Sequence, residues 1–376
     1  MGVVSSSAGL SSAMEDDDDY QYWLFQKLLN ETENTTDPSY VVSKTVQLCE
    51  KNTVNQFGAT VIPAFYCVSF ILSSIGNGLV LLIIYKFEKL NTVTNIFLLN
   101  LVLSNILFAS SMPFWAVYHM SEWIFGTALC KIVSSAYFIG FYSSILFLTL
   151  MTFDRYLAVV HAVAAAKSRK KVYAIISSVV VWCLSIAASV KELVLRNVWK
   201  NTLHGLMCEE SGLPASTMEQ WRLFSYYQQF LLFFLLPLIM VMYCYISITL
   251  RILNTRMKGK CRAIKLIFVI ILTFFGCWTP YNVVSLLRVI QISQSRREEG
   301  LCSDSDGLDF AFYVTRNVAY LYCCISPVFY TFLGKKFQSH LKRLLGKNVP
   351  CLKGQVSLNS HSTRTMSQRS PHSVYE

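Results

Sequence analysis

The chain has 376 residues, of which 53% are hydrophobic, 14% are aromatic and only 15% are charged. This composition excludes an ordinary soluble domain of the same length and indicates a membrane protein. The formal net charge is +11, and many of the cations fall in short connections between apolar segments. We therefore interpret the charge as attraction to anionic lipid or to an intracellular partner, and we expect no nucleic-acid partner.

The first 59 residues precede any long apolar segment and are predicted to form an acidic, glycosylated tail outside the cell. An acidic run over residues 15–19 is followed directly by Tyr20 and by Tyr22. Such runs often bind a basic partner, although a solubilising tail with no specific ligand fits the stretch equally well. Asn30 and Asn34 each begin an Asn-X-Thr tripeptide, the acceptor for N-linked glycosylation.

Residues 60–333 contain seven apolar segments that are long enough to cross a membrane as helices. We therefore predict an all-α membrane protein with a seven-transmembrane helix bundle. Pro113, Pro237, Pro280 and Pro327 are predicted to interrupt four of the helices, which favours a bundle with two possible packings. The segments run from Thr60 to Tyr85, Asn95 to Met120, Thr127 to Val160, Val172 to Leu195, Arg222 to Leu253, Arg262 to Ile292 and Leu308 to Leu333.

Lysine and arginine gather in the connections that follow the first, third, fifth and seventh segments. Because cytoplasmic loops carry the excess of such cations, we place these connections inside the cell. The N-terminus is then extracellular and the C-terminus cytoplasmic, as in a multi-pass protein of the plasma membrane. Of 12 cysteines, only Cys49, Cys130, Cys208 and Cys302 fall outside the cell, where oxidising conditions favour disulfides and three pairings are possible.

Asp154, Arg155 and Tyr156 lie near the end of the third segment, just before a basic connection. Charged residues at the mouth of a membrane helix are costly, and they usually pair or mark function. One interpretation is that Arg155 bonds a neighbouring helix in one state and a partner protein in another. The other is that its side chain simply extends to the membrane interface.

After the last segment, residues 334–347 alternate apolar and basic side chains and are predicted to form an amphipathic helix on the membrane surface. Residues 348–376 are predicted to be a disordered cytoplasmic tail rich in serine and threonine. Phosphorylation of that tail would create an anionic segment for a basic partner, whereas a plain flexible tail needs no partner.

The sequence shows no nucleophile paired with a base, no metal-ligand cluster and no phosphate-binding loop, so we expect no enzyme activity, no cofactor and no metal. The seventh segment has no lysine for a retinal Schiff base, which disfavours a photoreceptor. The segments also lack a chain of buried acids suited to ion transport.

A series of short motifs, in this order and spacing, resembles the rhodopsin-like G-protein-coupled receptors and, within them, the chemokine receptors. The resemblance covers about residues 49–347, and residues 316–319 make the chain most similar to the XC-type (lymphotactin) receptors. The motifs are Gly76-Asn77, Leu99 to Leu101, Ser111 to Trp115, Trp123 to Gly126, Cys130, Asp154 to Val163, Trp182, Pro237, Cys277 to Asn282 and Cys323 to Tyr330.

The resemblance implies a receptor that binds an extracellular chemokine and activates a heterotrimeric G protein of the inhibitory class, driving calcium signalling and chemotaxis. The alternative is an atypical scavenging receptor of the same fold without G-protein signalling. Arrestin, receptor kinases and membrane lipid are further implied partners. The family also implies disulfides pairing Cys130 with Cys208 and Cys49 with Cys302.

The same resemblance assigns roles to individual side chains, including sulfated tyrosines in the acidic tail that would bind the basic body of a chemokine. The implied ligand-binding residues are Tyr20, Tyr22, Trp115, Tyr118, Tyr137, Gln229, Tyr281, Arg288 and Arg316. Those implied in activation and G-protein coupling are Asp154, Arg155, Tyr156, Val163, Tyr245, Trp278, Pro327 and Tyr330.

The resemblance also implies that the N-terminus of the chemokine enters the helical pocket. Arg316 stands where many chemokine receptors have glutamate, which suggests that this entering segment offers a carboxylate. An internal ion pair, for example with Glu192, is the alternative. Asn105 replaces a usual aspartate and Ser326 a usual asparagine, so we do not expect modulation by sodium. A polar network linking Asn77, Asn105, Ser144 and Ser326 to Tyr330 is compatible with these residues.

Overall fold

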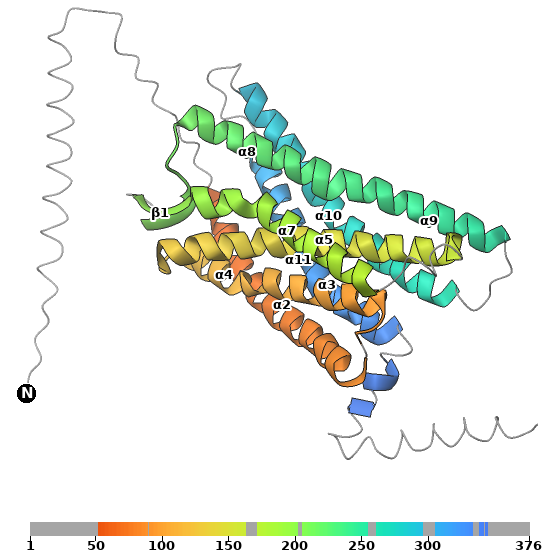
Figure 1. The fold of residues 1–376 in the computed structure, drawn as a ribbon. Coiled ribbons are helices and arrows are strands. Elements are labelled where there is room, and N and C mark those ends of the chain that lie inside the picture. Colours follow the sequence, from red (N-terminus) through yellow and green to blue (C-terminus); the bar gives the residue numbers. More distant parts are fainter. Residues whose placement is uncertain are drawn as a thin grey trace, which may run out of the picture. The chain divides into compact units, whose positions relative to one another are not determined.

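The computed structural model describes residues 52–88, 90–162, 171–201, 205–254, 261–295, 305–333, 338–341 and 343–344 (Figure 1). The roles predicted for Tyr20, Tyr22, Asn30, Asn34, Cys49, Val163 and Cys302 concern residues outside these ranges and stay predictions. Ser326, Pro327 and Tyr330 lie in a described helix, but their side chains are outside the description. The predicted surface helix is described only in two short helical fragments, at 338–341 and 343–344.

The described helices form a bundle of packed rods, as the sequence predicts (Figure 1). Helix α5 is central, because it packs against α3, α7, α9 and α10. Within the described ranges, five stretches are long and apolar enough to cross a membrane, and α10 and α11 pack beside them. The helices are α2 (Asn52–Phe87), α3 (Val93–Ser110), α4 (Met112–Met120), α5 (Gly126–Val160), α7 (Lys171–Leu195), α8 (Ala215–Phe230), α9 (Leu236–Asn254), α10 (Cys261–Ser295) and α11 (Ser305–Leu333), with a π-helical turn, η1 (Leu231–Leu235).

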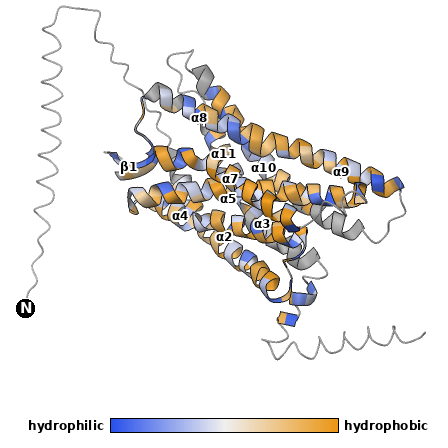
Figure 2. Ribbon diagram, in the orientation of Figure 1, coloured by the Kyte–Doolittle hydropathy of each residue, from blue (hydrophilic) through white to orange (hydrophobic). Residues whose placement is uncertain are grey.

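The surface of the bundle is apolar along the helices. Figure 2 shows α9 predominantly hydrophobic along its length, while β1 and the far end of α9 are hydrophilic. Large apolar side chains such as Val179, Val180 and Ile239 are exposed rather than buried. Exposed apolar surface on this scale is stable in lipid and not in water, which agrees with a membrane protein.

A short β-hairpin departs from the all-helical prediction. Strand β1 (Arg196–Asn201) follows α7 directly and pairs antiparallel with β2 (Gly205–Glu210), so that Val198 lies opposite Cys208. Gly205 begins β2 with φ +69°, a backbone conformation that residues with a Cβ rarely adopt. The helix-length apolar windows used for prediction contain no signal for two six-residue strands.

Helices α3 and α5 approach closely because Gly140 has no side chain. A Cβ atom at this position would lie 2.6 Å from the backbone nitrogen of Phe108 and 2.8 Å from the carbonyl oxygen of Ser104. One turn further along α5, the Ser143 hydroxyl donates to Ser104 Oγ at 2.8 Å. Small and hydroxylated residues of this kind let membrane helices pack backbone to backbone.

Two of the four predicted helix interruptions are present. A break at Ser111 separates α3 from α4, just before Pro113, and the Ser111 hydroxyl donates to a carbonyl three residues earlier at 2.7 Å. The turn η1 ends just before Pro237. By contrast, α10 continues through Pro280 and α11 through Pro327, so neither helix is broken there, and a bend at either proline stays a prediction. A proline removes a single N–H donor, and the remaining bonds can keep a helix continuous.

The buried amides of the bundle bond to one another, as expected for amides away from water. Asn105 Nδ2 donates to Asn77 Oδ1 at 3.2 Å, joining α3 to α2. The indole of Trp182 on α7 donates to Asn100 Oδ1 at 2.9 Å. The hydroxyl of Ser144 donates to a carbonyl of its own helix, α5. The first link of the predicted polar network is therefore present, and its links to Ser326 and Tyr330 stay predictions.

Candidate functional site

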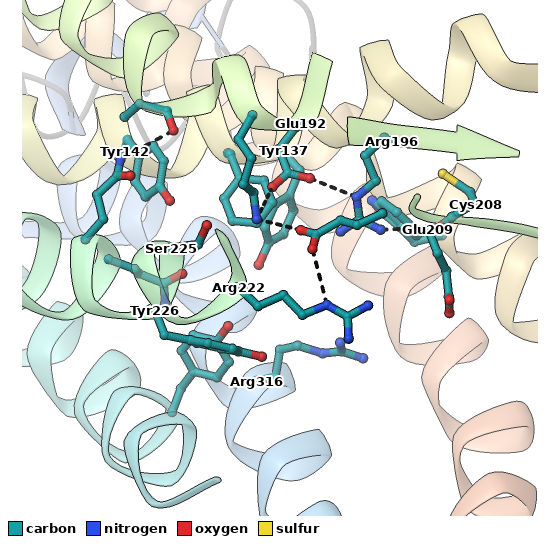
Figure 3. A pocket seen from close by; sticks show the side chains of 18 of the residues that line it. Tyr137, Tyr142, Glu192, Arg196, Cys208, Glu209, Arg222, Ser225, Tyr226 and Arg316 are labelled. Atoms are coloured by element: carbon teal, nitrogen blue, oxygen red, sulfur yellow. Dashed lines mark hydrogen bonds and ion pairs between the residues drawn. The ribbon is translucent and has the colours of Figure 1, made fainter. Parts of the chain in front are cut away.

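A cavity of about 390 Å³ lies among the helices at the end of the bundle that carries the β-hairpin, here called the hairpin end (Figure 3). Its volume is in the range of sites for small molecules or for a short peptide segment. Its walls combine aromatic rings with charged side chains. The lining residues are Tyr66, Trp115, Tyr118, His119, Tyr137, Phe138, Tyr142, Ala188, Lys191, Glu192, Arg196, Cys208, Glu209, Glu210, Arg222, Ser225, Tyr226, Gln228, Gln229, Tyr281, Phe312, Arg316 and Tyr320.

The hairpin is fixed to the bundle by one covalent and two hydrogen-bonded links. Cys130 on α5 forms a disulfide with Cys208 on β2, which confirms the predicted pairing. The backbone N–H of Trp123 donates to the Leu206 carbonyl at 2.8 Å, and the Leu206 N–H donates to the Glu122 carboxylate at 2.6 Å. The hairpin is thereby held against the connection between α4 and α5, at the edge of the cavity.

Five charged side chains connect the hairpin to the helices around the cavity, and we call them the hairpin network. Glu210 on β2 pairs with Lys191 on α7 at 2.5 Å and with Arg222 on α8 at 3.3 Å. Glu192 pairs with Arg196 at 2.8 Å and with Lys191 at 3.3 Å. Figure 3 labels three members of the network, Glu192, Arg196 and Arg222, at the cavity. The pairs of Glu210 bridge three separate elements, β2, α7 and α8, by charge.

The hairpin network shifts the pKa values of Glu210 and Arg196, its two members in the hairpin. Burial alone would raise the pKa of the Glu210 carboxyl, but Lys191, followed by Arg196 and Arg222, outweighs burial and holds that pKa below its ordinary value. Burial alone would lower the pKa of the Arg196 guanidinium, and Glu192 reverses the effect and raises it. Glu210 and Arg196 are therefore both charged at neutral pH.

Aromatic side chains form the inner part of the cavity and connect it to the core. The hydroxyls of Tyr137 and Tyr320 are hydrogen-bonded at 2.7 Å. The ring centroid of Tyr281 lies 5.8 Å from that of Trp278, whose ring in turn stacks on Phe141 at 4.2 Å. Contact with Tyr281 or Tyr320 can thus reach the core through Trp278 without an intervening gap.

The structure brings together most of the predicted ligand-binding residues within its described ranges. Those that line the cavity are Trp115, Tyr118, Tyr137, Gln229, Tyr281 and Arg316. Arg288 is not among the lining residues, because its guanidinium pairs with Asp309 at 2.7 Å and lies 4.5 Å from the ring centroid of Phe312. The binding roles of all these residues stay predictions.

Among the described residues, Arg316 does not form the internal ion pair that the sequence left open. Its suggested partner, Glu192, is bound instead by Arg196 and Lys191. The Nε and Nη2 atoms of Arg316 are buried and have no hydrogen-bond partner among the described residues. The guanidinium lies near the rings of Phe312 and Tyr313, at 5.4 and 5.2 Å from their centroids.

At the other end of α5, Arg155 is held by a neighbouring helix. Its Nη2 donates to Thr94 Oγ1 on α3 at 2.6 Å, and the same hydroxyl donates to the Asp154 carboxylate at 3.3 Å. Asp154 is buried, and the Tyr156 hydroxyl lies 3.0 Å from His161 Nε2. Tyr245 is buried in the core, as is Trp278. This arrangement agrees with the interpretation in which Arg155 bonds a neighbouring helix in one state.

Sequence reasoning missed four members of the hairpin network: Lys191, Arg196, Glu210 and Arg222. One signal was available, because Glu209 and Glu210 directly follow Cys208 and so must lie beside any disulfide made by that cysteine. Nothing in the sequence indicated that Lys191 and Arg222, from two separate apolar segments, would meet the second of these acids.

Comparison with known proteins finds a family and close relatives. Residues 76–330 match the family described as "7 transmembrane receptor (rhodopsin family)". The chain is 38% identical over 303 residues to "C-C chemokine receptor type 1" of Homo sapiens, which covers 80% of this chain and 84% of that protein. It is also 38% identical over 304 residues to "C-C chemokine receptor type 3" of Cavia porcellus, covering 81% and 83% of the two chains.

Proposed function

The chain belongs to the rhodopsin family of G-protein-coupled receptors and is a chemokine receptor of that family, and from this premise we propose how it works. A chemokine binds at the hairpin end, which faces the extracellular side, and activates an inhibitory-class heterotrimeric G protein at the Arg155 end. Activation leads to calcium signalling and chemotaxis. Within the family, the chain is a receptor of the XC type, and its chemokine is lymphotactin.

The observation that carries this proposal is the aromatic and charged cavity beneath the hairpin. About 390 Å³ is too small for a folded domain and suits a few residues of extended chain. The terminal segment of the chemokine therefore enters the cavity, while its folded body stays outside. Tyr20, Tyr22 and the acidic run beside them bind that basic body, and this attraction weakens as salt is raised.

Activation couples the cavity to the Arg155 end through the core. An inserted segment that displaces Tyr281 or Tyr320 also displaces Trp278, which packs against Phe141 on α5. The same helix carries Arg155, held by Thr94 in this structure. Release of Arg155 frees it for the G protein, with Tyr245, Pro327 and Tyr330 rearranging around it and Val163 making an apolar contact.

The segment after α11 also supports the proposed surface helix. The His340 ring stacks on Phe87 with centroids 4.9 Å apart, and His340 Nε2 lies 3.4 Å from the Glu88 carboxylate. Arg343 lies over the same Phe87 ring at 5.6 Å. These contacts hold the segment beside the end of α2, where an amphipathic helix would rest on lipid. Receptor kinases and arrestin act on the tail beyond it.

A cell assay tests the proposal. Cells expressing the receptor are exposed to a panel of chemokines that includes lymphotactin, and inhibitory G-protein activation and chemokine uptake are recorded together. We expect lymphotactin to activate, and pertussis toxin to abolish the response. The Arg155→Ala variant should bind and take up chemokine without activating.

Two outcomes contradict the proposal in different ways. Uptake by the unaltered receptor without any G-protein activation identifies a scavenging receptor instead. Activation by another chemokine of the panel, but not by lymphotactin, removes the XC assignment and leaves the rest.

A further inference from the structure

Arg316 is a partly buried cation, and within the described ranges its charge is not balanced by an acid. No carboxylate among the described residues forms an ion pair with it, and its Nε and Nη2 atoms have no hydrogen-bond partner there. Buried charges in proteins are normally paired, because an unpaired charge away from water is costly. The neighbouring rings of Phe312 and Tyr313 offset only part of this cost.

The two unpartnered atoms define one edge of the guanidinium. The Nε–H bond and one Nη2–H bond of arginine point in parallel, and this planar pair matches the two oxygens of a carboxylate. A single lone donor would fit water or a carbonyl group equally well. The free edge therefore specifies a planar, two-oxygen anion more closely than any other partner.

The surroundings supply further donors, and Glu209, an acid that also lines the cavity, forms no ion pair with Arg316 in the described part of the chain. The phenol groups of Tyr66, Tyr137 and Tyr320 are close enough to interact electrostatically with the guanidinium. The acids of the hairpin network are occupied by their own cations at 2.5–3.3 Å. Asp309, on the same helix as Arg316, is bound by Arg288 at 2.7 Å. Figure 3 shows Arg316 extending into the cavity.

We propose that this part of the cavity is a carboxylate-binding subsite, in which the free edge of Arg316 binds an aspartate or glutamate side chain of the inserted ligand segment. The inference rests on the proposed function, because it takes the ligand to be a protein with one segment in the cavity. The hydrogen-bonded pair of Tyr137 and Tyr320 lines the same cavity as Arg316.

The test is a double-mutant cycle between receptor and probe. The probes are lymphotactin and a lymphotactin variant in which each acidic residue ahead of the first cysteine is replaced by its amide. Potency in G-protein activation is measured for the unaltered receptor, for Arg316→Gln and for Arg316→Lys. Surface expression is measured through an N-terminal tag, and Arg316→Lys keeps the charge in case Arg316→Gln does not reach the surface.

On the unaltered receptor, we expect the amide probe to lose about 10- to 100-fold in potency, the range for a hydrogen-bonded charge pair. With the unmodified probe, Arg316→Gln should lower potency by the same factor, and changing to the amide probe should lower the potency of that variant no further. Arg316→Lys should lower potency less than Arg316→Gln. Lys200→Gln removes an exposed cation from β1, outside the cavity, and should show no coupling to the probe.

Other results overturn the inference. If the potency losses caused by Arg316→Gln and by the amide probe are additive, no probe carboxylate contacts Arg316. Equal potency of the two probes on the unaltered receptor shows the same. If replacing chloride by isethionate changes potency while the amide probe does not, a free inorganic anion occupies the subsite instead. If the unaltered receptor binds no chemokine of the panel, the proposed function fails and the inference with it.

Discussion

The Glu210→Gln substitution tests whether the hairpin network holds the hairpin to the helices. It removes the charge that pairs with Lys191 at 2.5 Å and with Arg222 at 3.3 Å. Breaking a buried pair by removing one partner costs about 3–5 kcal/mol. Two features reduce that figure here: Glu192 still lies 3.3 Å from Lys191, and the Arg222 side chain is 55% exposed, so its pair contributes little. We therefore expect a loss of about 2 kcal/mol.

The assay is thermal unfolding of the detergent-solubilised receptor, followed by a dye that reacts with thiols such as buried Cys244 as they become exposed. A loss of this size should lower the unfolding midpoint by about 4 °C at neutral pH. The matched control is Glu209→Gln, which removes the same charge one residue earlier on β2, from an acid that takes no part in the ion pairs described above. Its midpoint should stay within about 1 °C of the unaltered receptor.

The pH dependence provides a second check with a definite sign. The pKa of Glu210 is lowered in the folded protein, so its contribution is complete above the pKa of the unfolded chain and is lost as pH falls through the lower, folded pKa. The midpoints of the unaltered receptor and of Glu210→Gln should therefore converge in acid. Equal effects of the two substitutions at neutral pH, or a constant difference down to acid pH, would refute the role of the network.

The remaining predictions concern packing, signalling and the disulfide. In the same unfolding assay, Gly140→Ala should destabilise the bundle by about 1–3 kcal/mol, because the added Cβ would lie 2.6 Å from a backbone atom of α3. The control, Gly78→Ala, should be neutral or slightly stabilising, because a Cβ there would have no atom within 4 Å. Thr94→Val removes the acceptor of the 2.6 Å hydrogen bond from Arg155. Without ligand, nucleotide exchange on the G protein should then rise about fivefold or more, because the bond no longer restrains Arg155. Unchanged basal exchange would argue against such a restraint. Cys208→Ser should cost about 2–5 kcal/mol through loss of the disulfide, and unaltered surface expression and chemokine binding would contradict a structural role for the hairpin link.

Features carried by one continuous segment could be predicted from the sequence. Membrane helices follow from apolar runs, because each helix satisfies its own backbone hydrogen bonds in lipid whatever its neighbours are. The bundle was anticipated on this basis, whereas the contact of Asn77 with Asn105 between two helices was anticipated because a buried amide needs a partner. The pairing of Cys130 with Cys208 came from family resemblance instead, since spacing alone allows three pairings of the four predicted outer cysteines.

Features that depend on distances between remote residues could not be predicted. The β-hairpin was missed because six-residue strands are shorter than the windows that reveal membrane helices. Helix continuity through Pro280 was also missed, since neighbouring structure decides whether a proline interrupts a helix. Arg288 was grouped with the cavity residues, although its pairing with Asp309 is visible only once α10 and α11 are packed together.

The sequence by itself determined that this chain spans a membrane as a helical bundle, because hydropathy is a property of each continuous segment. It also determined that the chain carries a receptor's motifs, because motif spacing is a property of order along the chain. Only the tertiary structure decided which charges neutralise one another. Lys191, Glu210 and Arg222 come together from three elements. Glu192 pairs with Arg196, and two donors of Arg316 have no partner in the part of the chain that the structure describes. Electrostatic pairing falls off over a few ångströms, so it is settled by packing and cannot be read from order along the chain.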